Sequence, residues 1–272
     1  MIAVAALDDP RVEAYRQVGD QHALEAEGLF VAEGRLVVAR LLAESAGAGR
    51  WAGTARSVLL SPAAFESMSG GLELSLGVPV YVAPQDVMNS IVGFNIHRGC
   101  LALARRLPVP SLSDELLRGR SCAVVLEGVS NPDNIGGIFR SGAALGADLV
   151  ALGPGCADPL YRKSIRTSIG ATLALPFVAA QPWPDALGHL RRTGFTIAAL
   201  TPTADARPLQ GWRPAPGRVA LLAGAEGNGL SDQALAAADV RLTIPMTDRV
   251  DPLNVHTAVA IALYHVRVSR ES

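Results

Sequence analysis

The sequence predicts an α/β protein with two domains, the second of which contains a mostly parallel β-sheet. Three observations support this prediction. The chain has 272 residues, which is more than one typical domain needs and too few for three. Short apolar segments alternate with helical segments along most of its length. The stretch LPVPSLSD, at residues 107–114, interrupts this alternation with prolines and serines, as a linker does. We therefore expect an N-terminal domain at residues 1–107, a linker at 108–114 and a C-terminal domain at 115–272.

In the N-terminal domain the alternation begins near Leu29 and is typical of a small α/β unit. Its segments are LFVAEG (29–34), the helical GRLVVARLLAES (34–45), SVLLS (57–61), PAAFESM (62–68), VPVYVA (78–83), PQDVMNSIVG (84–93) and GCLALARR (99–106).

In the C-terminal domain the expected strands are short and apolar throughout, which predicts a parallel sheet covered on both faces. They are CAVVLE (122–127), DLVAL (148–152), PFVAA (176–180), FTIAAL (195–200), RVALLAG (218–224) and VRLTIP (240–245).

The last helix has the clearest pattern in the chain, and Asn254 lies where its N-cap should be. One face should pack on the domain, and the other should be free for solvent or a partner. The packing residues are Val255, Ala258, Val259, Ala262, Leu263 and Val266, and the free face carries His256, Tyr264, His265 and Arg267.

Composition excludes several classes of protein. The formal net charge is -1, so no global positive field indicates a nucleic-acid binder. Cys100, Cys122 and Cys156 are far apart and lack matching histidines, so we expect neither a zinc site nor a disulfide framework. The N-terminus lacks a basic region followed by a long apolar core, and no apolar run is long enough to span a membrane. We expect a cytoplasmic protein without a metal.

The loop after the first strand of the C-terminal domain combines asparagines with a pair of glycines. Its sequence, GVSNPDNIGG, leads into a helix that should start near Asn134. Gly136 and Gly137 each cost this helix about 1 kcal/mol relative to alanine, so some group should approach its backbone closely. Arg140 lies off the apolar stripe and can reach back to the helix N-terminus, where an anion would bind. The alternative is a solvated arginine after a tight turn.

Two further loops follow apolar strands. LLAGAEGNGLSD, at residues 221–232, folds tightly through its glycines, encloses Glu226 and ends in a helix cap at Ser231 or Asp232. It has neither the Gly-Lys-Ser/Thr of a P-loop nor the GxGxxG spacing of a dinucleotide fold. IPMTDRVDPLNV, at residues 244–255, crosses from a strand to the last helix.

Together, and in this order, the three loops resemble the signature of the SpoU (TrmH-like) RNA ribose 2'-O-methyltransferases of the SPOUT superfamily. The shared motifs are Asn-Pro-x-Asn-x-Gly with Arg140 six residues after the second asparagine, Gly-x-Glu-Gly-x-Gly-Leu, and Ile-Pro-Met ending in Leu-Asn-Val. The resemblance covers roughly residues 121–268. The N-terminal domain also resembles the small ribosomal-protein-like RNA-binding domain that many members carry.

The resemblance implies a trefoil-knotted domain that binds S-adenosylmethionine in a bent form between the second and third loops. It also implies an obligate homodimer in which each site is completed by Arg140 of the other subunit, and an RNA substrate, ribosomal or transfer RNA. The implied cofactor-binding residues are Leu222, Gly224, Ile244, Met246 and Leu253, and the implied catalytic residues are Arg140, Asn134, Glu226 and Asn254.

Deprotonating a guanidinium is very costly, so we expect Arg140 to hold the adjacent phosphate and stabilise developing alkoxide charge, with the proton acceptor left open. Asn134 and Asn254 can orient groups without adding charge, and Glu226 can pair with an arginine or fix its loop.

The chain departs from the family pattern at two positions. Pro252 stands where a serine is usual, and His256 replaces the serine of Asn-Val-Ser, which removes a hydroxyl expected near Arg140 or the substrate phosphate. His256 is either a substitute donor or acceptor, or a surface residue. His97 and Arg98 either touch RNA or cap a strand. The alternatives to a ribosomal-RNA methyltransferase are a transfer-RNA methyltransferase and a dimeric RNA-binding protein that has lost catalysis.

Overall fold

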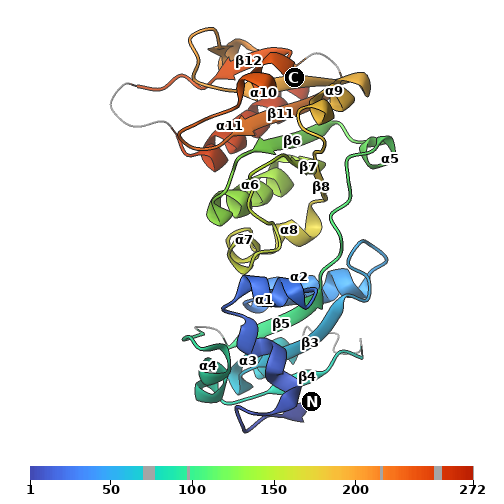
Figure 1. The fold of residues 1–272 in the computed structure, drawn as a ribbon, viewed down its shortest axis with the longest axis vertical. Coiled ribbons are helices and arrows are strands. Elements are labelled where there is room, and N and C mark those ends of the chain that lie inside the picture. The colour runs from blue at the N-terminus through green and yellow to red at the C-terminus, as the bar shows by residue number, and fades with distance from the viewer. Residues whose placement is uncertain (70–76, 97–98, 215–216, 248–252, 272) are drawn as a thin grey trace. The chain divides into compact units, whose positions relative to one another are not determined.

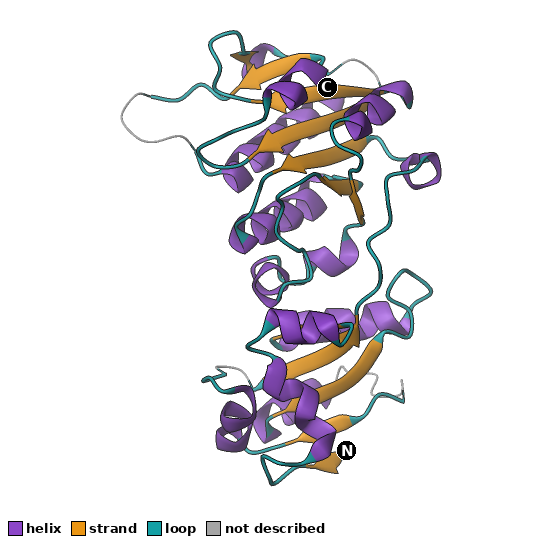
Figure 2. Cartoon of the chain, viewed as in Figure 1, coloured by secondary structure: helices purple, strands orange, loops and turns teal. Residues whose placement is uncertain are grey.

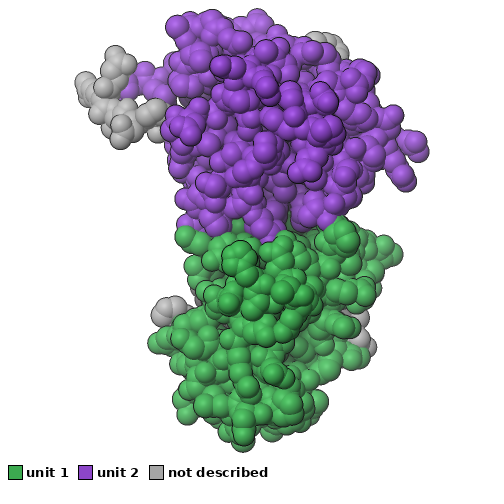
Figure 3. All heavy atoms as spheres, viewed as in Figure 1, with its two compact units in different colours: residues 1–108, 160–173 green, residues 109–159, 174–272 purple. Residues whose placement is uncertain are grey.

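The structure is a computed structural model that describes residues 1–69, 77–96, 99–214, 217–247 and 253–271 (Figure 1). The chain forms two compact units, which Figure 3 distinguishes by colour. Unit 1 comprises residues 1–108 and 160–173, and unit 2 comprises residues 109–159 and 174–272. The first boundary lies at the start of the expected linker. Of the residues discussed above, His97, Arg98 and Pro252 lie outside the described ranges.

Residues 160–173 group with unit 1, although the sequence places them in the C-terminal domain. Their helix α7 (Arg162–Thr167) packs against strand β2 (Leu29–Glu33), and Arg162 forms an ion pair of 3.1 Å with Glu33. The indole of Trp51 donates a hydrogen bond of 2.8 Å to the carbonyl of Leu173. The segment therefore completes the packing of unit 1, which a pattern local in sequence does not reveal.

Within the described residues, unit 1 contains a five-stranded mixed sheet in the order β1-β4-β3-β5-β2. β4 pairs in parallel with both β1 and β3, and β5 pairs antiparallel with both β3 and β2. The strands are β1 (Ile2–Ala3), β2, β3 (Ala55–Leu60), β4 (Val80–Val82) and β5 (Cys100–Arg105). The helices are the 3-10 helix η1 (Pro10–Gln17), α1 (Gln21–Ala26), α2 (Arg35–Ala46), α3 (Pro62–Ser69), α4 (Gln85–Val92) and α7, which α8 (Ala171–Ala174) follows.

Within the described residues, unit 2 contains a seven-stranded sheet in the order β10-β12-β9-β11-β6-β7-β8 (Figure 2). Every neighbouring pair in it is parallel, which confirms the prediction of a mostly parallel sheet. The strands are β6 (Cys122–Glu127), β7 (Leu149–Leu152), β8 (Phe177–Ala179), β9 (Phe195–Leu200), β10 (Arg207–Pro208), β11 (Arg218–Gly224) and β12 (Val240–Thr243).

Helices cover both faces of this sheet, as expected for parallel strands. On one face, α9 (Asp185–Arg192) and α10 (Asp232–Ala237) share a core with alternate strand residues such as Val125 and Leu222. On the other face lie α6 (Pro132–Leu145) and α11 (Val255–Glu271), which pack against each other. There Phe139 of α6 meets Phe177 of β8 edge to face, with ring centroids 5.8 Å apart. The remaining helices of unit 2 are α5 (Asp114–Leu117) and the 3-10 helix η3 (Leu209–Gly211).

Two predicted helix N-caps are confirmed, and a third helix starts two residues earlier than predicted. The Asn254 side chain accepts a hydrogen bond of 2.9 Å from the backbone N–H of His256, so it caps α11 as predicted. Ser231 caps α10, also as predicted. The helix after β6 was expected to start near Asn134; α6 starts two residues earlier, at Pro132, because Asn131 is its N-cap and proline suits the first helical position.

The face of α11 that was expected to be exposed makes a contact within unit 2. The packing face is buried as predicted at Val255, Val259, Ala262, Leu263 and Val266. His265, however, was expected on the free face, whereas its Nε2 lies 2.7 Å from the carbonyl oxygen of Trp212 and its ring stacks on that indole.

Candidate cofactor and active site

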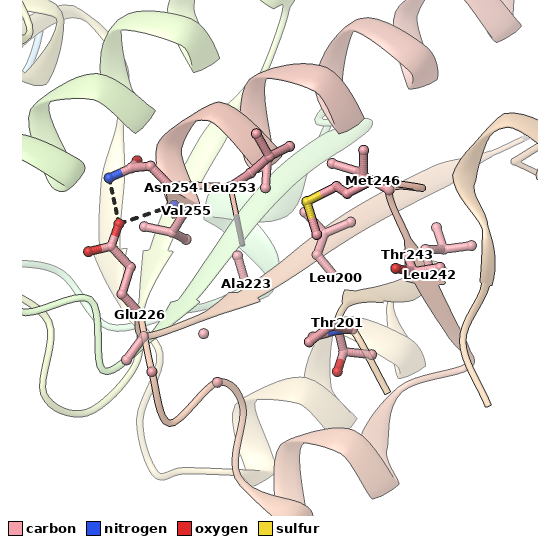
Figure 4. A pocket seen from close by; sticks show the side chains of 17 residues that line it. Leu200, Thr201, Ala223, Glu226, Leu242, Thr243, Met246, Leu253, Asn254 and Val255 are labelled. Carbon is pink, nitrogen blue, oxygen red and sulfur yellow. Dashed lines mark hydrogen bonds between the residues drawn. The ribbon is translucent and has the colours of Figure 1, made fainter. Parts of the chain in front are cut away.

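A pocket of about 460 Å³ opens at the carboxyl ends of three neighbouring parallel strands, β9, β11 and β12 (Figure 4). In open parallel sheets this edge is where ligands bind, because the loops that leave the strands meet there. Its walls are mostly apolar side chains and backbone, a composition typical of small-molecule sites. The lining comprises Leu200, Thr201, Pro202, Ala223, Gly224, Ala225, Glu226, Gly227, Gly229, Leu242, Thr243, Ile244, Met246, Leu253, Asn254, Val255 and Ala258.

The glycine-rich loop after β11 can close over the pocket only because residue 224 has no side chain. A Cβ on Gly224 would lie 2.3 Å from the carbonyl carbon of Gly229 and 2.5 Å from the nitrogen of Leu230. The N–H of Gly229 donates a hydrogen bond of 3.0 Å to the carbonyl of Ala225, so the chain reverses tightly. Gly227 and Gly229 both have positive φ, at 87° and 67°, which glycine adopts without strain. The spacing of these glycines therefore shapes one wall of the pocket.

Three polar side chains, one from each of the three loops, meet beside this wall. The amide nitrogen of Asn254 donates one hydrogen bond to Oδ1 of Asn134, at 2.9 Å, and another to Oε1 of Glu226. The same Glu226 oxygen also accepts from the backbone N–H of Val255 at 3.4 Å (Figure 4). Of the alternatives for Glu226, pairing with an arginine or fixing its loop, the contacts support the second. The Asn134 side chain is buried, so this network joins the start of α11 to α6 and to the glycine loop.

A residue of α11 packs so closely on α6 that a glycine is needed there. A Cβ on Gly137 would lie 2.8 Å from Cγ of His256 and 3.0 Å from its Cβ and Cδ2. The predicted close approach to this backbone is therefore made by a side chain of the same chain. His256 is half-buried against α6, so it is not the surface residue that one interpretation of the sequence suggested.

Arg140 is exposed on α6 and is not among the residues that line the pocket. Within the described ranges its guanidinium makes no hydrogen bond or ion pair. On a helix, residue 140 shares a face with residue 137, three positions earlier, and its side chain leans toward that turn. Residue 140 therefore lies one turn along α6 from the glycine that the His256 imidazole contacts.

Four of the five residues expected to contact a cofactor line the pocket: Gly224, Ile244, Met246 and Leu253. Leu222 does not. Its side chain is fully buried in the core beneath α9 and α10, because successive strand residues point to opposite faces and Ala223 is the one that faces the pocket. The Leu222 side chain therefore does not line the pocket, and a part of this residue in cofactor binding stays a prediction.

Sequence reasoning missed the contribution of the β9 end. Leu200, Thr201 and Pro202 line the pocket, although nothing in their sequence marks a motif. The available signal was topological, since β9 pairs in parallel with both β11 and β12, and its carboxyl end had to meet theirs.

A buried carboxylate, that of Glu127, anchors the end of the glycine-rich loop that follows β11. Glu127, at the end of β6, is 9% exposed and accepts three hydrogen bonds. Its Oε1 accepts from the indole N–H of Trp183 at 2.8 Å and from the Ser231 hydroxyl at 2.7 Å, and its Oε2 accepts from the Ser231 N–H at 2.9 Å. Ser231 directly follows the glycine loop, so Glu127 fixes the point at which that loop joins α10.

No group of three or more His, Cys, Asp or Glu side chains within the described ranges of the chain is placed to hold a metal ion. Nor is any helix in those ranges both long and apolar enough to cross a bilayer.

Comparison with known proteins identifies relatives. The model of the SpoU rRNA Methylase family matches residues 121–264. An uncharacterized tRNA/rRNA methyltransferase of Mycobacterium tuberculosis is 41% identical over 263 residues, 94% of this chain and 88% of that protein. The 23S rRNA (guanosine(2553)-2'-O)-methyltransferase of Bacillus subtilis is 27% identical over 195 residues, 72% of this chain and 75% of that protein.

Solved structures share the fold. The AdoMet-bound rRNA methyltransferase from Sinorhizobium meliloti superposes with a TM-score of 0.79 at 22% identity, covering 99% of this chain and 97% of that chain. The AdoMet-bound SpoU methyltransferase AviRb from Streptomyces viridochromogenes superposes with a TM-score of 0.77 at 20% identity, covering 97% and 99%. From the matched family model and the 41% identical relative, we conclude that this chain belongs to the SpoU rRNA methylase family.

Proposed function

We propose that this protein transfers a methyl group from S-adenosylmethionine to a ribose 2'-hydroxyl of structured RNA, with ribosomal RNA as the substrate. The observation that carries the proposal is the meeting of three distant loops at one pocket, where Asn254 joins Asn134 of the first loop to Glu226 of the second. The names of the relatives, which are rRNA and tRNA methyltransferases, support the same activity and leave transfer RNA as the other substrate class.

The pocket suits a nucleoside-containing cofactor. The side chains of Leu253 and Met246 are 38% and 44% exposed, although contact between large apolar side chains and water is unfavourable. A flat aromatic base bound in the pocket would cover them. The turn at Gly224 brings backbone groups to the wall without a side chain in the way, so N–H and C=O groups can hydrogen-bond the base and sugar. We therefore assign Gly224, Ile244, Met246 and Leu253 to cofactor binding.

When bound, the sulfonium group supplies an activated methyl. The protein has to align the ribose oxygen in line with that methyl and stabilise the charge that develops as the hydroxyl proton leaves. Asn254 and Asn134 hold α11 and α6 in register beside the pocket, and Glu226 ties both to the cofactor loop. Arg140 holds the phosphate next to the reacting ribose.

We propose a homodimer because Arg140 does not line the pocket of its own chain. A second copy can supply that guanidinium, as the family resemblance implies. A stripe of exposed apolar side chains on α11, at Ile261, Tyr264 and Val268, supports a contact there, since exposed apolar patches favour association. The stripe follows helical spacing, on a face distinct from the buried one.

Three further expectations belong to the same proposal. Unit 1 has an α/β fold and would bind the RNA, through the placement of its arginines rather than through net charge. The path of unit 2 would form the trefoil knot of the SPOUT superfamily, which the fold shared with SpoU methyltransferase structures supports. A ribosomal- or transfer-RNA substrate would place the protein in the cytoplasm.

The test is to titrate the protein with S-adenosylmethionine by calorimetry, then incubate it with labelled cofactor and unmodified ribosomal or transfer RNA and map the product. We expect saturable binding and one methylated ribose in ribosomal RNA. A product in transfer RNA would change the substrate, and a methylated base would refute the proposed chemistry. RNA binding without cofactor binding would favour the alternative of a catalytically inactive RNA-binding dimer.

A further inference from the structure

The His256 imidazole presents two nitrogen atoms in different surroundings. Nδ1 is enclosed by protein and has no hydrogen-bond partner among the described residues. Nε2 also makes no hydrogen bond within those residues, but it is not enclosed. The ring is held in place by the first turn of α11 on one side and by Gly137 of α6 on the other. One nitrogen is therefore locked inside, and the other remains available.

This difference favours one tautomer of the neutral ring. A neutral imidazole carries its proton on one nitrogen, and the other nitrogen is an acceptor. A proton on Nδ1 would be a buried N–H donor without an acceptor, which is rarer and more costly in proteins than an unpaired acceptor. The surroundings thus favour, for the neutral ring, the tautomer with its proton on Nε2, which makes the available nitrogen a donor.

The position of the ring indicates what it would donate to. Its neighbour on the same face of α6 is Arg140, an exposed guanidinium without a partner among the described residues. Two unpaired donors on one helix face match an anionic oxygen, and RNA offers one at each phosphate. In the proposed homodimer Arg140 completes the site of the other subunit, so the phosphate held on this face belongs to the RNA bound at that site.

We propose that His256 is a substrate-binding residue whose Nε2–H donates a hydrogen bond to a phosphate oxygen of the RNA on the Arg140 face of α6, and that it is not the base that accepts the ribose proton. The inference rests on the proposed function. It gives the histidine the role of a donor, which requires a hydrogen on Nε2, whereas a base acting through the same atom requires a lone pair there.

The first test measures the proton position and does not depend on activity. Long-range nitrogen–proton NMR spectra of protein labelled with nitrogen-15 in histidine distinguish the two tautomers, and the signals of His256 are assigned by their absence in His256→Gln. The chain has five histidines, so the spectrum is simple. We expect an unprotonated Nδ1 and a protonated Nε2 at pH 7.5. A protonated Nδ1 at this pH would overturn the proposal.

The second test uses matched side chains. Glutamine places an amide nitrogen near the position of Nε2, and asparagine places one near Nδ1, so only His256→Gln keeps the proposed donor. With unmodified 23S rRNA transcribed in vitro as the probe, we expect His256→Ala and His256→Asn to raise KM for RNA about 10- to 100-fold, the effect of losing one hydrogen bond to a charged group. His256→Gln should stay within about threefold, and cofactor affinity should be unchanged in all three.

The pH profile separates a donor from a base. If His256 donates, wild type and His256→Gln share one profile of kcat/KM between about pH 6 and pH 8, because both protonation states of the ring keep the Nε2 hydrogen. A fall in wild-type activity toward pH 6 that disappears in His256→Gln would assign the residue to proton transfer and refute the proposal. Unchanged KM in His256→Ala would also refute it.

The third test checks the contact that fixes the ring. Gly137→Ala should disturb RNA binding in the same way as His256→Ala, because the new Cβ would lie 2.8 Å from Cγ of the ring. In the His256→Ala background the 2.8 Å contact with the ring is gone and only the Cβ of residue 256, at 3.0 Å, remains close, so the same change should lower Tm less there than in the wild-type background. Gly188→Ala in α9 is the control, since its Cβ would meet only the flexible end of Arg192, at 3.4 Å. A Gly137→Ala protein with normal KM would overturn the argument.

The two proposals fail in distinguishable ways. If wild type methylates no RNA or does not bind S-adenosylmethionine, the proposed function fails, and the tautomer measurement still tests the state of the ring. If wild type is active and the His256 variants behave as it does, only the donor role fails.

Discussion

Replacing Glu127 by glutamine tests how the cofactor loop is held. The carboxylate accepts hydrogen bonds from the Trp183 indole, the Ser231 hydroxyl and the Ser231 N–H. Glutamine keeps one acceptor oxygen, which can serve the first two donors. Its amide nitrogen then faces the Ser231 N–H, so one bond is lost and a backbone donor is left without a partner.

The expected loss in the free energy of unfolding is about 2–3 kcal/mol, since a hydrogen bond to a charged group contributes about 1.5–3 kcal/mol. For a domain of this size that corresponds to a fall in Tm of roughly 4–12 °C. Glu127→Ala loses all three bonds and leaves a cavity, so its loss should be larger. The control is Glu271→Gln at the exposed end of α11, where the carboxylate pairs with Arg267 at 3.3 Å on the surface and the change should cost less than about 0.5 kcal/mol.

The assay is scanning calorimetry, with the transition of unit 2 identified as the one that saturating S-adenosylmethionine shifts upward, because a ligand stabilises the state that binds it. The same variant should bind the cofactor more weakly, since Ser231 joins the glycine loop to α10. Stability of Glu127→Gln equal to that of Glu271→Gln would show that the network contributes nothing, and the reasoning would fail.

Three other predictions concern the pocket and the thiols. Gly224→Ala should abolish cofactor binding in calorimetry, because its Cβ would lie 2.3 Å from the backbone of Gly229, whereas Gly211→Ala, with open space around it, should bind normally; equal affinities would contradict the assignment. Arg140→Ala should lower turnover on RNA about 100-fold or more with cofactor affinity unchanged, and undiminished turnover would exclude a role in the reaction. Burial raises the pKa of the Cys100 thiol to about 12 and that of Cys122 to about 11, so neither should react with a disulfide reagent at pH 8 until urea unfolds the chain, and rapid reaction of the native protein would be the contrary result.

Periodicity and motif order predicted much of unit 2. The strand expected at residues 122–127 is β6 to the residue, and the three loops meet as their shared resemblance implied. What the sequence did not show depends on contacts distant in sequence. Leu222 belongs to the same strand as Gly224, and only the pleat of β11 decides which side chain faces the pocket. Thr201 lies in an ordinary loop that becomes part of the site because β9 is next to β11.

The first 28 residues of unit 1 also escaped prediction. η1 is a 3-10 helix without a regular apolar stripe, yet it buries Val12 and Tyr15, and the Tyr15 hydroxyl lies 2.9 Å from that of Ser57. Its partners come from a strand forty residues later, which no local pattern contains. The roles of Arg140, Asn134, Glu226 and Asn254 in catalysis stay predictions.

The grouping of residues 160–173 with unit 1 has a consequence for biosynthesis. Domains commonly fold one after another as the ribosome releases them, the N-terminal one first. Here the first unit lacks the α7 contact with β2 and the Trp51 bond to Leu173 until the chain has been translated past residue 173. By then the residues of β6 and β7, which belong to the other unit, have also been translated. A nascent chain arrested at residue 108 would expose the apolar surface that residues 160–173 cover, so it should bind chaperones. The two units should therefore complete their folding at nearly the same time.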